Sequence, residues 1–144
     1  GAPPPPEWRL SAEELDSVFT AVDLVMLPRA VSRYVARLTA ATHPGATEAT
    51  AAVTDFVTYG ASPRAAIAMA EAARAHALLA GRPTVGFEDV RAVAPAVLNH
   101  RIITNYKARF EGMDAFAVVR SLLDEIDETG DDLPRDLTVE TATA

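Results

Sequence analysis

The segment between Gly60 and Gly81 constrains the fold of this chain most, because it has the pattern of one long helix with a defined start and stop. Ser62 is a suitable N-cap, and Pro63 suits the first helical position, where its missing amide hydrogen costs nothing. Alanine, the strongest helix former, dominates the residues that follow, and Gly81 is a typical helix stop. Alanine accounts for 29 of the 144 residues of the whole chain. The sequence therefore predicts an all-α fold, a small helical bundle around a single core.

A first helix is predicted near the N-terminus. Residues 11–14, Ser-Ala-Glu-Glu, fit a capping box, in which the serine caps the helix start and the second glutamate reaches back to the serine amide. The spacing predicts a short helix that buries Leu15 and either Val18 or Phe19. The largely apolar residues 22–27 then fit either a short extended piece or a connector.

The next helix is predicted over residues 28–42, because proline suits its first turn and a Pro-Gly pair follows its end. Residues 43–52 have the composition of a loop, and residues 53–59 fit a helical turn and an extended segment equally well. The apolar residues of the helix recur at the spacing of one face: Val31, Tyr34, Val35 and Leu38.

Two more helices are predicted in the C-terminal half, over residues 87–98 and 115–127, with a short connector at 100–103. Pro95 lies inside the first of them and should kink or shorten it. Apolar residues mark one face of each helix. In the first helix they are Val90, Val93, Ala94, Val97 and Leu98, and in the second Val118, Val119, Leu122 and Ile126.

The net charge of −7 comes from the C-terminal end of the chain. Residues 121–144 hold eight acids and one base, whereas the other 120 residues hold twelve of each and sum to zero. We therefore divide the chain into a proline-rich linker (1–7), a helical domain (8–128) and an acidic, disordered tail (129–144). A neutral body argues against nucleic-acid binding, which depends largely on neutralising phosphates.

Several kinds of site are absent from the sequence. The chain has no cysteine and its three histidines lie far apart, so no metal site is expected. It has no glycine-rich phosphate loop and no nucleophile elbow, so these residues alone are not expected to be catalytic. The acidic pairs Glu13-Glu14 and Glu88-Asp89 lie at predicted helix starts, where the helix dipole favours them for structural reasons.

The location of the protein can be predicted only from what the chain lacks. No apolar run reaches the length of about 18 residues that suits a membrane span. The first residues are proline-rich and do not have the basic and apolar regions of a signal peptide. These features favour a cytoplasmic location.

One residue near the start of the alanine-rich helix, Arg64, invites a functional explanation. A helix start presents free amides and a partial positive charge, so it suits a phosphate group. A cation in the first turn opposes the helix dipole, and arginine can hold two phosphate oxygens at once. A phosphate contact would explain Arg64, but a solvated arginine on an ordinary helix start also fits, and the spacing alone favours the solvated residue.

Two strings of the sequence resemble a known family. Residues 60–65, GASPRA, open the alanine-rich helix, and residues 94–101, APAVLNHR, end the helix that follows. With the helical segments around them they resemble the C-terminal lid of MoxR-family AAA+ ATPases, over about residues 8–127. The chain departs from the family pattern at Gly86-Phe87, where threonine-proline is usual, and at His43, where a basic residue is common.

The resemblance implies a small helical lid that packs over a nucleotide held by a separate AAA+ core of the same parent chain. Arg64 takes the place of the family's sensor-two arginine, a catalytic and nucleotide-binding residue that points at the terminal phosphate. Ser62 and Pro63 take the place of the residues that set its helix start. ATP and Mg²⁺ would be bound by the parent protein, and the isolated lid would bind ATP weakly or not at all.

The resemblance also implies a wider role for the parent protein. Family members form homo-oligomeric rings and couple ATP hydrolysis to chaperone-like remodelling or maturation of partner protein complexes. They commonly work with partners that carry von Willebrand A-type domains. Lids of the magnesium-chelatase branch share the fold and the sensor arginine, but the GASPRA and NHR strings favour the MoxR branch.

Two functions of other classes remain open. A non-catalytic helical interaction module could use its acidic tail to recruit a basic partner, although such tails are more often simply solvated. A helical DNA-binding regulator would use residues 63–101 as a helix–turn–helix, and the neutral body makes this the weaker alternative. Five arginines are spread along that segment: Arg64, Arg74, Arg82, Arg91 and Arg101.

Overall fold

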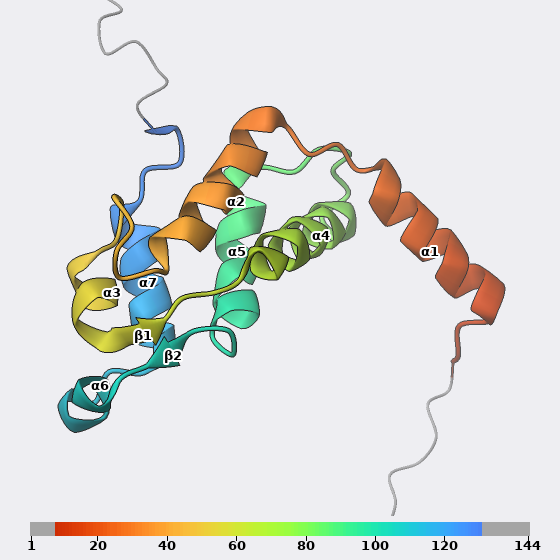
Figure 1. The fold of residues 1–144 in the computed structure, drawn as a ribbon. Coiled ribbons are helices and arrows are strands. Elements are labelled where there is room, and N and C mark those ends of the chain that lie inside the picture. Colours follow the sequence, from red (N-terminus) through yellow and green to blue (C-terminus); the bar gives the residue numbers. More distant parts are fainter. Residues whose placement is uncertain (1–7, 131–144) are drawn as a thin grey trace, which may run out of the picture.

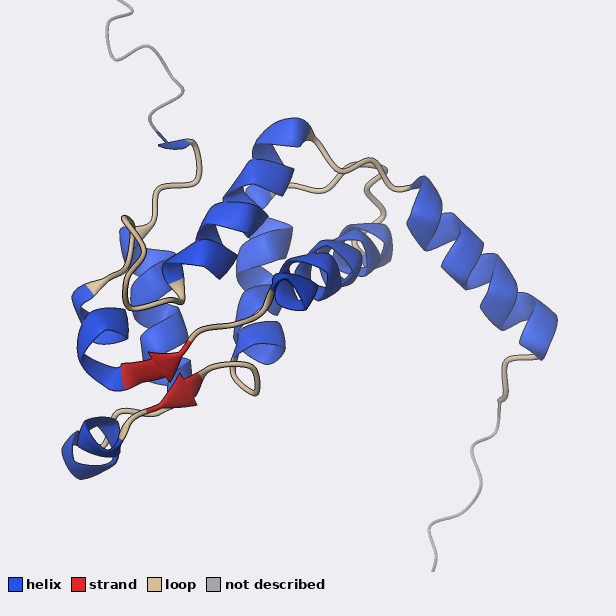
Figure 2. Ribbon diagram, viewed as in Figure 1, coloured by secondary structure: helices blue, strands red, loops and turns tan. Residues whose placement is uncertain are grey.

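The computed structural model describes residues 8–130 of the chain. The predicted linker at residues 1–7 and most of the predicted tail, residues 131–144, lie outside this range. Within it, helices dominate and two short strands form the one sheet (Figures 1 and 2), so the all-α prediction is confirmed. The helices are α1 (Ala12–Leu24), α2 (Arg29–Ala41), α3 (Ala51–Phe56), α4 (Pro63–Leu79), α5 (Phe87–Leu98), α6 (Tyr106–Glu111) and α7 (Ala115–Glu125), and the strands are β1 (Val57–Tyr59) and β2 (Ile103–Thr104).

The core lies between α2, α4, α5 and α7. Helix α4 makes its most extensive contacts with α5 and also packs on α2. Three of its four buried residues are alanines, and a face of small side chains lets the neighbouring helices approach closely. The buried residues recur every four positions: Ala65, Met69, Ala73 and Ala77. The alanine-rich sequence therefore serves both helix formation and close packing.

The predicted apolar faces of α2, α5 and α7 point into this core. All four predicted residues of α2 are buried, as are Val118, Val119 and Leu122 of α7. Helix α5 has the predicted bounds and buries four of its five predicted residues, while Val93 packs against the core half-buried. Pro95 does not shorten the helix, because the buried Val97 and Leu98 hold the last turn against the core.

Helix α1 confirms its predicted start but not its predicted burial. The Ser11 hydroxyl accepts from the Glu14 amide at 3.1 Å, and the Glu14 carboxylate accepts from the Ser11 amide at 2.7 Å. None of the helix's residues is buried, however, and the side chains of Leu15, Val18 and Phe19 are 43%, 44% and 61% exposed. Helix α1 projects away from the body (Figure 1), and its large apolar side chains are left exposed.

The segment after α1 resolves an alternative that the sequence left open. The helix continues to Leu24, so the first half of residues 22–27 is neither extended nor a connector. Met26 is extended and forms a parallel bridge with Thr84, in which its amide donates to the Pro83 carbonyl at 2.9 Å. This bridge joins the start of α2 to the loop between α4 and α5.

Residues 51–59 adopt both of the predicted conformations in turn. Thr50 caps α3 by accepting from the Val53 amide, so the helix begins at Ala51, two residues before the predicted boundary at residue 53. Strand β1 follows at once and pairs antiparallel with β2, the end of the predicted connector. The strand pairing joins residues more than 40 positions apart in the sequence, so no local pattern predicts it.

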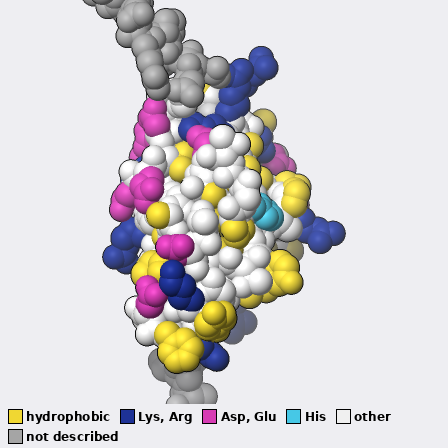
Figure 3. Space-filling model, turned by 60° about the vertical axis from the view of Figure 1, so that its left-hand side comes forward, with side chains coloured by type: hydrophobic (Ala, Val, Ile, Leu, Met, Phe, Trp, Pro, Cys, Tyr) yellow, Lys and Arg dark blue, Asp and Glu magenta, His cyan; other side chains and the backbone are white. Residues whose placement is uncertain are grey.

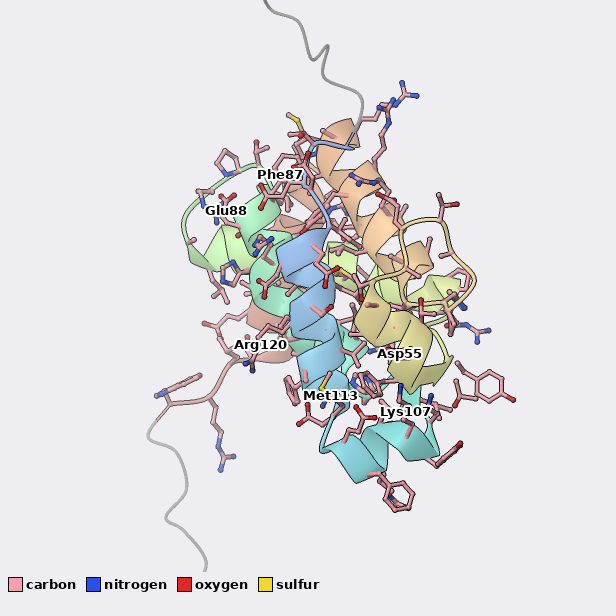
Figure 4. All side chains as sticks on the ribbon, turned by 90° about the vertical axis from the view of Figure 1, so that its left-hand side faces the viewer. Asp55, Phe87, Glu88, Lys107, Met113 and Arg120 are labelled. Carbon is pink, nitrogen blue, oxygen red and sulfur yellow. The ribbon has the colours of Figure 1, made fainter. Side chains whose placement is uncertain are left out.

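Helix α6 was not predicted. Its signals are present, because the Asn105 side chain accepts from the Ala108 amide at 3.0 Å and Gly112 ends the helix with a φ of +70°. Its six residues are too few to show a periodic pattern. Lys107 and Asp55 lie together at this end of the molecule (Figure 4), with 3.8 Å between the ammonium nitrogen and a carboxylate oxygen. The ion pair links α6 to α3.

Helix α7 ends at Glu125, two residues earlier than predicted, and buries Leu123 in addition to the predicted face. Two arginines from other helices hold its C-terminal end. Arg91 donates to the Leu123 carbonyl at 2.6 Å, and Arg37 donates to the Asp127 carbonyl at 2.8 Å. The bond from Arg91 satisfies a carbonyl in the last turn of the helix, where carbonyls have no partner within the helix.

Candidate functional site

The first turn of α4 carries the three residues that the sequence singled out. Arg64 is the second residue of the helix and its side chain is exposed. Within residues 8–130, its guanidinium has no hydrogen-bond or ion-pair partner. A cation in the first turn, with no acid to balance it, opposes the helix dipole. The arginine is therefore placed where it is free to meet an anion from outside the described chain.

Ser62 and Pro63 set the start of the helix, but not in the expected way. Ser62 occupies the N-cap position with an extended backbone (φ −70°, ψ 164°), and Pro63 is the first helical residue. The predicted N-cap position of Ser62 is confirmed, but its hydroxyl accepts from no backbone amide of the described chain. The Ser62 carbonyl instead accepts from the Ala65 amide at 2.8 Å. The Ser62 side chain is left exposed, two residues before Arg64 in the sequence.

The loop before α4 is held by the end of α2. The Ala61 amide donates to the Thr42 hydroxyl at 2.8 Å, and the Ala61 carbonyl lies 3.0 Å from Nε2 of His43. Thr42 in turn donates its hydroxyl proton to the Thr39 carbonyl at 2.6 Å. In the sequence His43 stands out only as a departure from the family pattern, and no local signal links it to the loop before α4.

Gly60 makes this contact possible. A Cβ atom at this position would lie 2.7 Å from the His43 ring, the Thr42 carbonyl and the Thr42 hydroxyl oxygen. Because these contacts are far below van der Waals distance, only glycine lets the loop lie so close to α2. The glycine of the GASPRA string therefore has a structural role that the string alone did not reveal.

An apolar hollow of about 370 Å³ lies beside the helix start, between α2 and α4. His43 and Pro63 form part of its wall, and the remaining lining residues are small. The lining is Ala36, Thr39, Ala40, His43, Ala61, Pro63 and Ala66. Such a hollow can receive an apolar group beside Pro63, the residue before Arg64.

A second polar cluster lies at the far end of α4 and is structural. The buried Asp89 carboxylate accepts from Arg82 at 2.7 Å, from His76 at 2.6 Å and from the Gly86 amide at 2.8 Å. Burial raises the pKa of Asp89, but the bonds from Arg82, His76 and Gly86 outweigh burial and hold it well below its usual range. Asp89 thus caps α5 and ties it to α4, which supports the structural interpretation of the Glu88-Asp89 pair.

Three of the five arginines proposed for DNA binding are held by other groups of the chain. Arg82 is paired with Asp89, and Arg91 with Glu128 at 3.7 Å. Arg101 donates to the Val97 carbonyl at 2.8 Å. On the face drawn in Figure 3, acidic side chains lie among the basic ones. These positions weaken the DNA-binding alternative.

Two further findings concern residues 8–130 only. No three His, Asp or Glu side chains in that range are placed to share a metal ion. None of the described helices has the length and apolar character needed to cross a membrane.

Comparison with known proteins places the fold among ATPase lids. The model of the AAA lid domain family matches residues 49–122, about half of the chain. The chain is 41% identical over 70 residues to the uncharacterized protein YeaC of Bacillus subtilis (strain 168), covering 49% of this chain and 22% of that protein. It is 38% identical over 74 residues to the chaperone MoxR1 of Mycobacterium tuberculosis, covering 51% of this chain and 20% of that protein.

A solved structure is also similar. A protein of Cytophaga hutchinsonii, described as a "putative ATPase", superposes with a TM-score of 0.71 at 33% sequence identity. The match covers 75% of this chain and 33% of that one. The chain spans about a fifth of the length of the curated relatives it matches.

Proposed function

Because this chain belongs to the AAA lid domain family and is the helical lid of a MoxR-like AAA+ ATPase, we propose that Arg64 is its sensor-two arginine. In this role the guanidinium contacts the terminal phosphate of ATP held by a core domain of the same parent chain. The observation that carries the proposal is that Arg64, in the first turn of α4, is exposed and has no hydrogen-bond or ion-pair partner among residues 8–130.

The chemistry of the helix start supports this role. Arginine presents a planar fork of donors that matches phosphate oxygens, and it stays charged at any physiological pH. The dipole that makes Arg64 unfavourable in the isolated helix is favourable for the anion it would meet. Ser62 and Pro63 complete the nucleotide-binding turn by starting the helix directly before the arginine.

In the proposed mechanism the core binds ATP and Mg²⁺ and carries out hydrolysis. Arg64 stabilises the charge that develops on the transferred phosphoryl group, as arginine does in other phosphoryl-transfer enzymes. Loss of the terminal phosphate removes this contact, so the lid and core are held together differently in the two nucleotide states. The isolated lid offers only one arginine and one helix start, and it binds ATP weakly.

The resemblance to MoxR proteins extends the proposal to the whole protein. A homo-oligomeric ring would use the lid movement for chaperone-like remodelling or maturation of partner complexes in the cytoplasm, with a von Willebrand A-type protein as a partner. The similarity to a protein named as a chaperone supports this part of the proposal.

The test is ATP turnover by the full-length ATPase that contains this lid. Arg64→Ala should lower kcat by about 100-fold or more, and Arg64→Lys should recover only part of the loss, because a point charge does not replace the guanidinium fork. Arg120→Ala, which removes another exposed helix arginine, serves as the matched control and should leave kcat unchanged.

A folded Arg64→Ala variant with unchanged turnover and nucleotide affinity would contradict the proposal. It would leave the lid fold intact and favour the protein-interaction module instead.

A further inference from the structure

We infer that His43 is a positioning residue for Arg64, which acts by holding the loop that begins α4 against the end of α2. The inference rests on the proposed role of Arg64 and adds a residue from a different helix to it. His43 lies 21 positions before Arg64 in the sequence, and the connection between them exists only in the folded chain.

The first step is that two side chains at the end of α2 bind the backbone of Ala61. The Thr42 hydroxyl accepts from the Ala61 amide at 2.8 Å, and Nε2 of His43 lies 3.0 Å from the Ala61 carbonyl. Because a carbonyl only accepts, Nε2 carries the proton and donates it. Ala61 is fully buried and immediately precedes the N-cap of α4. Both of its polar backbone groups are therefore fixed by the end of one neighbouring helix.

The second step is that α4 has no side-chain anchor of its own at this end. The Ser62 hydroxyl caps no amide of the described chain, and Pro63 has no amide hydrogen to offer. By contrast, α3 and α7 begin with side-chain caps, from Thr50 and Asp114. The direction of the first turn of α4, and with it the position of Arg64, therefore depends on the hold from α2.

The third step is the space around the loop. Gly60 lies so close to Thr42 and His43 that no larger residue fits, whereas an apolar hollow of about 370 Å³ lies against Ala61 and Pro63. His43 and Pro63 both line that hollow. Removal of the imidazole would enlarge the hollow and leave the Ala61 carbonyl without its donor, so the loop would be free to move toward it.

The test uses kcat for ATP in the full-length ATPase that contains this lid, with a double-mutant cycle between His43 and Arg64. His43→Ala should lower kcat by about tenfold, because a small misplacement of a charge-stabilising group is costly. His43→Gln should restore most of the activity, since the glutamine amide can place a donor near the position of Nε2. In an Arg64→Ala background, His43→Ala should cause no further loss, because a positioning residue acts only through the residue it positions.

A matched control is available in His100, whose Nδ1 lies 3.2 Å from the Ala96 carbonyl at the end of α5. His100→Ala removes a similar contact away from α4 and should leave kcat unchanged. Thermal unfolding of each variant establishes that it is folded, and a merely structural role would move the unfolding midpoint without the dependence on Arg64.

The outcomes separate the inference from the function it rests on. If Arg64→Ala lowers kcat but His43→Ala does not, or if His43→Ala costs the same in both backgrounds, the positioning role is wrong and the sensor role stands. If Arg64→Ala has no effect, the sensor role itself fails. A folded His43→Gln variant as inactive as His43→Ala would also overturn the inference, since a donor placed near the Ala61 carbonyl would then not restore the activity.

Discussion

The starts of α4 and α5 lie in the same core pair of helices and are built in opposite ways. At α5, Glu88 and Asp89 place acids in the first turn, and Asp89 accepts from the Gly86 amide at 2.8 Å. At α4, the first turn holds Arg64, no acid and no side-chain cap. One start follows the preferences of an isolated helix, and the other runs against them.

The difference separates stability from function in this lid. At the α5 start, the Asp89 carboxylate is buried and is bonded by Arg82 and His76, so this capping group is used within the chain. The α4 start has an exposed cation and depends on α2 for its position. A helix start that is less stable than it could be is typical of a functional site.

The largest expected change in stability comes from breaking the α5 start. Asp89→Ala should lower the free energy of unfolding of the 144-residue chain by about 2 kcal/mol, because it removes the helix cap and leaves the Gly86 amide unpaired. Denaturant unfolding followed by circular dichroism measures the loss.

Glu88→Ala is the control for that measurement. Its side chain is largely exposed and pairs only at the surface with Arg82, so it should change the free energy of unfolding by less than about 0.5 kcal/mol. Equal losses in the two variants would show that burial of the carboxylate is not what stabilises α5.

A smaller change in the free energy of unfolding is expected when the pH is lowered. The folded-state pKa of Asp89 is held below its ordinary value of 3.8, so its stabilisation is present above that value and is lost as the pH falls below it. The free energy of unfolding should therefore decrease below about pH 4, and Asp89→Asn should flatten the decrease. The flattening should be partial, because the Arg37 hydrogen bond also lowers the pKa of Glu48. An unchanged slope in Asp89→Asn would contradict the assignment.

The smallest predicted change in the free energy of unfolding is a gain in stability, and it tests the comparison between the starts of α4 and α5 most directly. Arg64→Glu gives α4 the kind of first turn that α5 has, and it should raise the free energy of unfolding by about 0.5 kcal/mol. The same change should abolish ATP turnover in the full-length ATPase, since it places an acid against the phosphate. A loss of stability would show that Arg64 has a structural partner in the folded protein.

Much of the fold could be predicted, because the signals were local. The capping box at Ser11 and Glu14, the buried face of α2 and the bounds of α5 all depend on residues within one or two turns of each other. The strand pair and helix α6 could not be predicted in the same way. Each strand needs a partner far along the chain, and α6 is too short to show a periodic pattern.

The uncovered side of α1 is the clearest failure of a local argument. Its apolar residues have the spacing of a buried face, and the structure leaves them exposed. A periodic pattern shows that a helix has an apolar side, but it does not show which surface covers that side.

The candidate site divides in the same way. The sequence by itself determined that a helix starts at Pro63 and that Arg64 lies in its first turn, because caps, proline and the dipole act over neighbouring residues. Only the tertiary structure decided that the serine hydroxyl caps no described amide, that Asp89 is buried, and that Thr42 and His43 hold Ala61. These features depend on contacts between helices, and the packing of their side chains, rather than the sequence around each residue, selects them.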